Sequence, residues 1–324
     1  MPKAVFIEEF GGPEVMQMVD TQVSPPNSHE VTIRNTAIGL NFIDTYHRSG
    51  VYPVELPSHL GVEGAAVVTD LGADVEGLNL GDRVAYAGLP IGSYSEQRNY
   101  PADRLVKIPE SMPSDLAAAS MLKGLTAWYL ANKSYPIKIG DSVLIYAAAG
   151  GVGLFLCQWA NHLGAHVIGV VSTSEKAELA QQNGCTEIIY ADDKQLVKKT
   201  RELTNGKGVA AVYDSVGKDT FYQSLDCLQP HGVMISYGNA TGAVEPFPVL
   251  ELASRGSLFV TRPVLSDFIK ERQALVDAAD ELFTLISKKI IRVHLNTIMP
   301  LADVAQAHFN LESRATTGST ILKP

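Results

Sequence analysis

Short apolar runs of strand length alternate with longer segments of helical length in the middle of the chain, and this alternation predicts its central fold. An apolar run over residues 143–148 is followed by a glycine-rich turn, an apolar-faced segment that Gly164 ends, and a second apolar run over residues 167–171. Runs of this length favour buried strands, whereas the longer segment between them has helical length. The pattern therefore predicts a strand, a turn, a helix and a parallel strand within about 30 residues.

The alternation of strand and helix continues beyond this unit. Further strands are predicted at residues 187–190, 209–214, 232–236 and 257–262, and further helices at residues 195–203 and 219–227. With the first two, these runs make a series of six strands separated by helices. Such a series is typical of an α/β fold with a doubly wound parallel sheet, built from two mononucleotide-binding halves.

Residues 1–120 follow a different pattern. Strands are predicted at residues 4–7, 31–35 and 65–68, and a hairpin turn at 81–84 leads into another. Short strands separated by turns at a spacing of about ten residues are typical of a barrel or a sandwich. A helix is expected over residues 114–131, because Ser114 is a suitable N-cap and apolar residues recur at helical spacing after it.

After Pro263 the chain returns to the pattern of residues 1–120. A long helix is predicted over residues 270–287, a short strand near 292–294 and a final strand over 320–322. We therefore expect a nucleotide-binding domain, residues 123–263, inserted into a β-barrel domain that residues 1–122 and 264–324 form together.

Composition and charge exclude several classes of function. The 324 residues carry a formal net charge of −9, which disfavours nucleic acid or an anionic membrane as the main partner. Residues 143–160 have membrane-spanning length, but the glycines in their middle favour a buried strand and helix. Cys157, Cys185 and Cys227 are odd in number and far apart, which predicts a reducing, cytoplasmic location and no disulfide framework.

The turn after the first central strand carries the clearest chemistry. Its spacing, Ala148-x-Gly150-x-x-Gly153, is a variant of the dinucleotide fingerprint, and the strand and helix that the fingerprint requires are predicted on either side. Small residues let the backbone approach a pyrophosphate, and the N-terminus of the following helix attracts the anion. We therefore expect Gly150, Gly151, Val152 and Gly153 to bind a dinucleotide.

The second central strand indicates which dinucleotide binds. NAD-preferring sites place Asp or Glu at the end of this strand, where it binds the ribose 2′-hydroxyl. Here Ser172 and two further hydroxyl residues follow the strand, with Lys176 close behind. Hydroxyls and a cation suit a 2′-phosphate, so the pattern favours NADPH. Glu175 and Glu178 count against this choice, and we expect them to face solvent.

Several motifs resemble those of one enzyme family. They are spread over the whole chain, at residues 41–46 (Asn-Phe-Ile-Asp-Thr-Tyr), 48–50, 61–64, 122–126, 147–153, 213–217 and 313–316. The motifs and their spacing resemble the zinc-independent medium-chain dehydrogenase/reductases, in particular the NADPH quinone oxidoreductases of the zeta-crystallin type. Residues 34–39 and 45–48 also resemble the 2-haloacrylate reductases of that family. The resemblance implies a GroES-like β-barrel catalytic domain with an inserted Rossmann domain.

The resemblance also implies roles for individual residues. It places the loop of residues 41–46 and Tyr52 over the nicotinamide, so the implied catalytic residues are Asn41, Tyr46 and Tyr52. The alternative is that both tyrosines only pack at a barrel edge. Resemblance and strand ends together give a set of cofactor residues outside the glycine turn: Asn41, Asp44, Lys123, Thr126, Ser172, Lys176, Tyr190, Ser215, Asn239, Arg262 and Arg314. Arg262 has a second interpretation, as the exit of an edge strand.

A metal is not expected. The zinc-dependent relatives need catalytic Cys and His ligands and four closely spaced cysteines, which three scattered cysteines cannot supply. Residues 61–63 (Gly-Val-Glu) stand where those relatives place a His before the Glu. His47 and His59 are interpreted as surface or hydrogen-bonded histidines and not as a zinc pair.

We therefore expect a cytoplasmic, NADPH-dependent quinone reductase that works without a metal. One alternative, in the same pocket, is the reduction of an activated C=C bond in an enone or a 2-haloacrylate. A second alternative is a nucleotide- or RNA-binding module without catalysis, which the acidic chain disfavours. The resemblance further implies a homodimer that pairs through the edge strand near residues 257–262.

Overall fold

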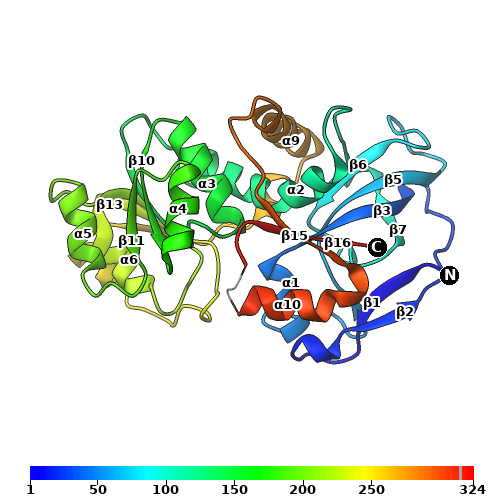
Figure 1. Cartoon of the computed structure of the whole chain (residues 1–324), viewed down its shortest axis with the longest axis horizontal. Helices are drawn as coiled ribbons and strands as arrows, with labels where there is room; N and C mark the ends of the chain where they lie inside the picture. Colours follow the sequence, from blue (N-terminus) through cyan, green and yellow to red (C-terminus); the bar gives the residue numbers. More distant parts are fainter. Residues whose placement is uncertain (314–315) are drawn as a thin grey trace. The chain divides into compact units, whose positions relative to one another are not determined.

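The computed structural model describes residues 1–313 and 316–324 (Figure 1). Its contacts divide the chain into two compact units. The first comprises Met1–Leu125, Phe268–Ser287 and Val293–Pro324, and the second comprises Thr126–Asp267 and Lys288–Arg292. Arg314 therefore lies outside the described residues. Each unit has its own sheet and its own core, so we describe each by itself.

The first unit contains a seven-stranded sheet and a three-stranded sheet. The large sheet has the order β15-β16-β3-β5-β6-β8, with β7 paired to β3, and its strands are β3 (Glu30–Leu40), β5 (Glu63–Leu71), β6 (Arg83–Ala87), β7 (Gln97–Pro101), β8 (Val106–Lys107), β15 (Leu295–Pro300) and β16 (Ser319–Lys323). The small sheet has the order β2-β1-β4, with β1 (Lys3–Ile7), β2 (Gln17–Asp20) and β4 (Ser58–His59).

Strand β3 organises this unit because it pairs antiparallel with β5, β7 and β16. Register shifts near its middle divide it into two halves. Val31 and Ile33 of the first half belong to one buried cluster, whereas Ile38 and Leu40 of the second half belong to another. The second half leads directly into α1 (Phe42–Ser49), so β3 sets where that helix begins.

Three further helices accompany these sheets: α2 (Ser114–Tyr129), whose residues up to Leu125 belong to the first unit, α9 (Arg272–Ser287) and α10 (Val304–Glu312). α2 and α9 cross closely at Gly124, where a Cβ atom would lie 2.6 Å from the Leu282 side chain. Glycine at this position therefore allows α9 to pack against α2. A π-helical turn, Leu130–Ser134, follows α2.

The second unit is a six-stranded parallel sheet with the order β11-β10-β9-β12-β13-β14. Its strands are β9 (Ser142–Tyr146), β10 (His166–Val171), β11 (Glu187–Tyr190), β12 (Val209–Asp214), β13 (Leu228–Ser236) and β14 (Phe259–Thr261). Its helices are α3 (Gly151–His162), α4 (Ser174–Gln182), α5 (Leu196–Leu203), α6 (Phe221–Cys227) and α7 (Leu250–Ser254), and α8 (Leu265–Phe268) follows. The chain runs outward from β9 to β11 and then returns to β12, which puts the topological switch point between β9 and β12. Figure 1 shows this sheet in green to yellow.

The doubly wound sheet predicted from the hydrophobic pattern is confirmed, and all six strands are present. Two local predictions are wrong, and one helix was not predicted. Residues 292–294 are not a strand, because β15 begins at Leu295. Residues 42–46 of the loop expected over residues 41–46 form the first part of α1, and α10 was not predicted. α1 buries Asp44, Thr45, His47 and Arg48, so its inward face is polar and hydrophobic periodicity cannot reveal it.

No described helix combines the length and the apolar character that crossing a bilayer requires.

Candidate active site

The glycine turn of the second unit has the geometry of a phosphate-binding turn. Ala147, directly after β9, has a positive φ of 50°, and the Gly150 N–H donates to its carbonyl at 2.8 Å. A Cβ atom at Gly153 would lie 2.1 Å from the same oxygen, so only glycine lets α3 pack this close to the turn. α3 begins at Gly151, and its first N–H groups lack partners within the helix. They are available to an anion.

The ends of β10 and β11 bring a second group of residues together. Val171 and Tyr190 are partners in the parallel register and each ends its strand, so Ser172, which follows Val171, stands beside the end of β11. Thr173 caps α4 by accepting the Lys176 N–H, and Lys176 Nζ donates to Ser172 Oγ at 3.4 Å. The Ser172 hydroxyl and the Lys176 ammonium group therefore lie together, and the exposed Tyr190 stands at the end of the neighbouring strand. Glu175 and Glu178 are exposed, as we expected from their places on the helix.

The loops after β12 and β13 form the next part of this edge. A Cβ atom at Gly238 would lie 2.5 Å from the Ser215 carbonyl oxygen, so glycine permits these two loops to touch. Asn239 stands in the second loop, and Arg262 directly follows β14. Buried Asp214 at the end of β12 stabilises the first loop, because its carboxylate accepts hydrogen bonds from two backbone N–H groups and two hydroxyls.

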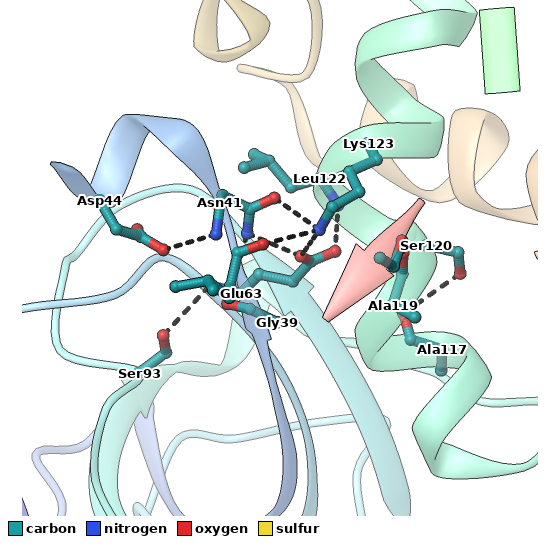
Figure 2. A network of polar contacts seen from close by, with 12 residues as sticks. Gly39, Asn41, Asp44, Glu63, Ser93, Ala117, Ala119, Ser120, Leu122 and Lys123 are labelled. Atoms are coloured by element: carbon teal, nitrogen blue, oxygen red, sulfur yellow. Dashed lines mark hydrogen bonds and ion pairs between the residues drawn. The ribbon is translucent and has the colours of Figure 1, made fainter. Parts of the chain in front are cut away.

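The first unit holds a buried polar network around Asn41 (Figure 2). Asn41 precedes α1, and its side chain Nδ2 donates to Glu63 Oε2 at 2.8 Å. Glu63 is fully buried at the start of β5, and its second oxygen accepts the Leu122 N–H at 2.6 Å. A Cβ atom at Gly39 would lie 2.0 Å from Glu63 Oε2, so the glycine leaves room for this carboxylate.

Lys123 of α2 completes the network. Its ammonium group donates to the Leu40 carbonyl at 3.0 Å and to Asn41 Oδ1 at 2.8 Å, and Glu63 Oε2 lies at 3.3 Å. An ammonium group has three protons, and each has a partner here. Lys123 therefore fixes the orientation of Asn41 and neutralises the charge of Glu63. Thr126 lies about one helical turn further along α2 and is half-buried.

Asp44 caps the first turn of α1 from inside the unit. Its Oδ2 accepts the Asn41 backbone N–H at 2.9 Å and the Tyr94 hydroxyl at 2.7 Å. Burial raises the pKa of Asp44 from 3.8 to about 7, although the two hydrogen bonds and the charge of Lys123 oppose the rise. This carboxyl group therefore changes charge near neutral pH.

Tyr46 and Tyr52 meet edge to face, with ring centroids 5.1 Å apart. The Tyr52 N–H donates to the Tyr46 carbonyl at 3.1 Å, which ties the loop after α1 to the helix. Both side chains are only half-buried, so packing leaves part of each ring exposed. The rings are thus close enough to contact one planar ligand.

Sequence reasoning assigned no role to Glu63, Tyr94 and His308. Only Glu63 gave a signal, because an acidic residue stands within an apolar strand between Val62 and Gly64. Among the described residues, no group of three His, Cys, Asp or Glu side chains is placed to hold a metal ion. His47 is nearly buried and packs near Tyr52, and His59 Nδ1 lies 3.3 Å from the Val5 carbonyl.

Two family models match the chain: the alcohol dehydrogenase GroES-like domain at residues 27–110 and the zinc-binding dehydrogenase at residues 151–280. The chain is 48% identical to the quinone oxidoreductase of Pseudomonas aeruginosa over the full length of both, and 43% identical to the 2-haloacrylate reductase of a Burkholderia species over 100% and 99% of the two chains. It also matches a structure of Escherichia coli quinone oxidoreductase complexed with NADPH, with a TM-score of 0.97 and 46% identity over 99% and 100% of the chains. The chain therefore belongs to the zinc-independent quinone oxidoreductases of the medium-chain dehydrogenase/reductase family.

Proposed function

We propose that this protein oxidises NADPH and passes the reducing equivalents to a quinone. The observation that carries the proposal is the full-length match, at a TM-score of 0.97, to an Escherichia coli quinone oxidoreductase complexed with NADPH. Two features of this chain support it independently: a turn at Gly153 into which only glycine fits, and a β10 end that offers Ser172 and Lys176. When bound, NADPH supplies the reducing equivalents, and the protein supplies binding and placement.

The edge of the parallel sheet would bind the phosphate-rich part of the cofactor. The pyrophosphate would accept N–H groups from the turn at residues 150–153, because those groups point out of the N-terminus of α3. Ser172, Lys176 and Tyr190 would take the 2′-phosphate, with Arg314 as a further candidate. Ser215, Asn239 and Arg262 would line the remaining strand ends.

The Asn41 network would serve the nicotinamide end and the acceptor. The proposed residues are Asn41, Asp44 and Lys123 with Thr126 for the cofactor, and Asn41, Tyr46 and Tyr52 for the reaction. One of the Tyr46 and Tyr52 rings would stack on a planar quinone, and because the two rings are inclined by 63° the other would meet the quinone at its edge and donate its hydroxyl proton to a quinone oxygen. The Asn41 Nδ2 group already donates to Glu63 Oε2. This hydrogen bond holds the Asn41 side chain in place more than it prepares Asn41 to activate the acceptor. A proton for the product can come from water.

A second acceptor class has specific support. The 43% identity to a 2-haloacrylate reductase extends over the whole chain, so reduction of an activated C=C bond is the alternative reaction. NADPH oxidation with 1,2-naphthoquinone and with 2-chloroacrylate, measured on one preparation, separates the two. The quinone proposal expects the higher kcat/KM with the naphthoquinone, and a higher value with the chloroacrylate would replace it with the alternative.

We also propose a cytoplasmic homodimer. β14 is an edge strand of the described sheet that pairs with β13 alone, and its Phe259 side chain is 59% exposed. An apolar edge strand needs a cover, and a second copy of the chain would supply one. Phe259→Glu is expected to yield monomers in light-scattering measurements. Phe309→Glu, at an equally exposed position on α10, is the control, and equal dissociation by both variants would refute this interface. The three free cysteines support a reducing compartment.

A further inference from the structure

Four buried side chains of the first unit form a hydrogen-bond chain that runs in one direction. Arg48 Nη1 lies 2.9 Å from His308 Nδ1, and His308 Nε2 lies 2.9 Å from the Tyr94 hydroxyl, which lies 2.7 Å from Asp44 Oδ2. An arginine only donates, so His308 Nδ1 accepts and the proton of the neutral ring is on Nε2. His308 then donates to Tyr94, and Tyr94 has its single proton left for Asp44.

Arg48, the first residue of the hydrogen-bond chain, is held by several further contacts. Arg48 makes two hydrogen bonds to Glu312 at the end of α10, at 3.0 and 2.8 Å, and Nε donates to the Gly11 carbonyl at 3.0 Å. The side chain of Arg48 is 3% exposed. Burial and the charge of Arg48 lower the pKa of His308 to about 3, so its neutral form persists over the working pH range. The direction of every hydrogen bond is thereby fixed.

The inner end of the chain meets the first turn of α1. Asp44 Oδ2 accepts from Tyr94 and from the Asn41 N–H, and Asp44 Oδ1 is buried without a partner among the described residues. Because both donors are aimed at Oδ2, a proton taken up by Asp44 must sit on Oδ1. The charged groups around Asp44 are Lys123 of α2, Glu63 of β5 and Arg48 of α1 itself. His308 of α10 faces it through Tyr94, and both stay uncharged.

We propose that Arg48, His308 and Tyr94 are positioning residues, whose one-directional hydrogen bonds hold the Asp44 carboxylate against the N-terminus of α1 and so keep Asn41 in place for the reaction. The proposal rests on the proposed function only in treating Asn41 as part of the reaction site. An ionised Asp44 is the stronger acceptor for the Asn41 N–H, and its negative charge also interacts favourably with the positive end of the α1 dipole. Uptake of a proton weakens this hold, so the active form is the ionised one.

The proposal predicts an acid limb in the pH profile of kcat/KM, at a pH that depends on the hydrogen-bond chain. Donation from Tyr94 favours the ionised form of Asp44, so Tyr94→Phe moves the limb to higher pH, by about one unit. Tyr100→Phe is the matched control, because Tyr100 is also a buried tyrosine but donates to the Leu89 carbonyl. Its acid limb stays at the wild-type position.

His308 provides a test of direction rather than of packing. Glutamine offers an acceptor oxygen and a donor NH2 group, which can replace the acceptor and the donor nitrogen of the neutral imidazole, and it cannot take up a proton. His308→Gln therefore keeps the acid limb near the wild-type position, whereas His308→Leu moves it upward in the same sense as Tyr94→Phe. A merely structural histidine would lose activity in both variants without a shift in pH.

The experiment measures kcat/KM for NADPH with 1,2-naphthoquinone across pH, together with denaturant unfolding of the same variants at each pH. Supporting results are an upward shift in Tyr94→Phe and His308→Leu alone, in both measurements. Equal profiles for Tyr94→Phe and Tyr100→Phe, or for His308→Gln and His308→Leu, overturn the proposal. If the wild type turns over no quinone, the proposed function fails, and the unfolding profiles still decide whether the chain acts on Asp44.

Discussion

The Lys123 ammonium group lies 2.8 Å from Asn41 Oδ1 and 3.3 Å from Glu63 Oε2, so one buried cation orients the amide and neutralises the acid that accepts from it. The ion pair between Lys123 and Glu63 is almost wholly hidden, with side-chain exposures of 7% and 0%. Lys123, which we expect from the resemblance to bind the cofactor, thus also fixes the positions of Asn41 and Glu63.

Lys123→Met is expected to lower the free energy of unfolding by about 3–5 kcal/mol, because it leaves the charge of Glu63 buried without its partner. The control is Lys107→Met, which breaks an exposed ion pair with Asp82 and is expected to cost about 1 kcal/mol or less. Denaturant unfolding measures both. Adding Glu63→Gln to Lys123→Met should recover part of the loss, and a double variant no more stable than Lys123→Met would contradict this account of the pair.

Gly153→Ala is expected to weaken NADPH binding at least about tenfold, because a Cβ atom would lie 2.1 Å from the Ala147 carbonyl oxygen and α3 would have to move away from the turn. Gly150→Ala is the graded comparison, since its Cβ atom would lie 3.0 Å from the same oxygen. Fluorescence titration with NADPH gives both dissociation constants. Equal affinity in Gly153→Ala and the wild type would rule out this turn as the pyrophosphate site.

Lys176→Ala combined with Arg314→Ala is expected to raise the KM for NADPH far more than the KM for NADH, because only NADPH carries the 2′-phosphate. Lys198→Ala removes a charge from an exposed site on α5 and should leave both constants unchanged. Steady-state kinetics with the two coenzymes provide the comparison. Equal effects on both coenzymes would show that the phosphate is bound elsewhere.

Asp44 is expected to make stability fall as pH rises from about 4 to about 7. Its pKa is raised from 3.8 to about 7 in the folded protein, so within this window the folded state holds a proton that the unfolded state has released. The stabilising contribution is complete below the window and absent above it. Asp44→Asn should flatten this part of the profile, as denaturant unfolding at pH 5 and pH 8 would reveal. A slope as steep as that of the wild type would assign the effect to another group.

The sequence was sufficient for the parallel sheet because its strands are continuous apolar runs, such as β12, whose six residues are all buried. It was also sufficient for the glycine turn, where strand, spacing and helix agree. It was insufficient for α10, which buries only Val304, Ala307 and His308, too weak a pattern to set a helix apart from a loop.

The polar network was beyond local reasoning for a different reason. Tyr94 and His308 are 214 residues apart, and Arg48 and Glu312 are 264 apart. These residues meet because the C-terminal part of the chain packs back onto the first unit, and no local spacing in the sequence indicates such pairs. The roles proposed for Tyr46 and Tyr52 stay predictions, because they depend on a ligand.

The most direct test of the proposed function is NADPH oxidation by the purified protein, followed with and without 1,2-naphthoquinone in a stopped-flow instrument, with the quinone product identified. We expect oxidation that depends on the quinone, is faster than with NADH, and yields reduced naphthoquinone. No oxidation of NADPH above the rate without acceptor, for this quinone and for any other in an acceptor panel, would contradict the account.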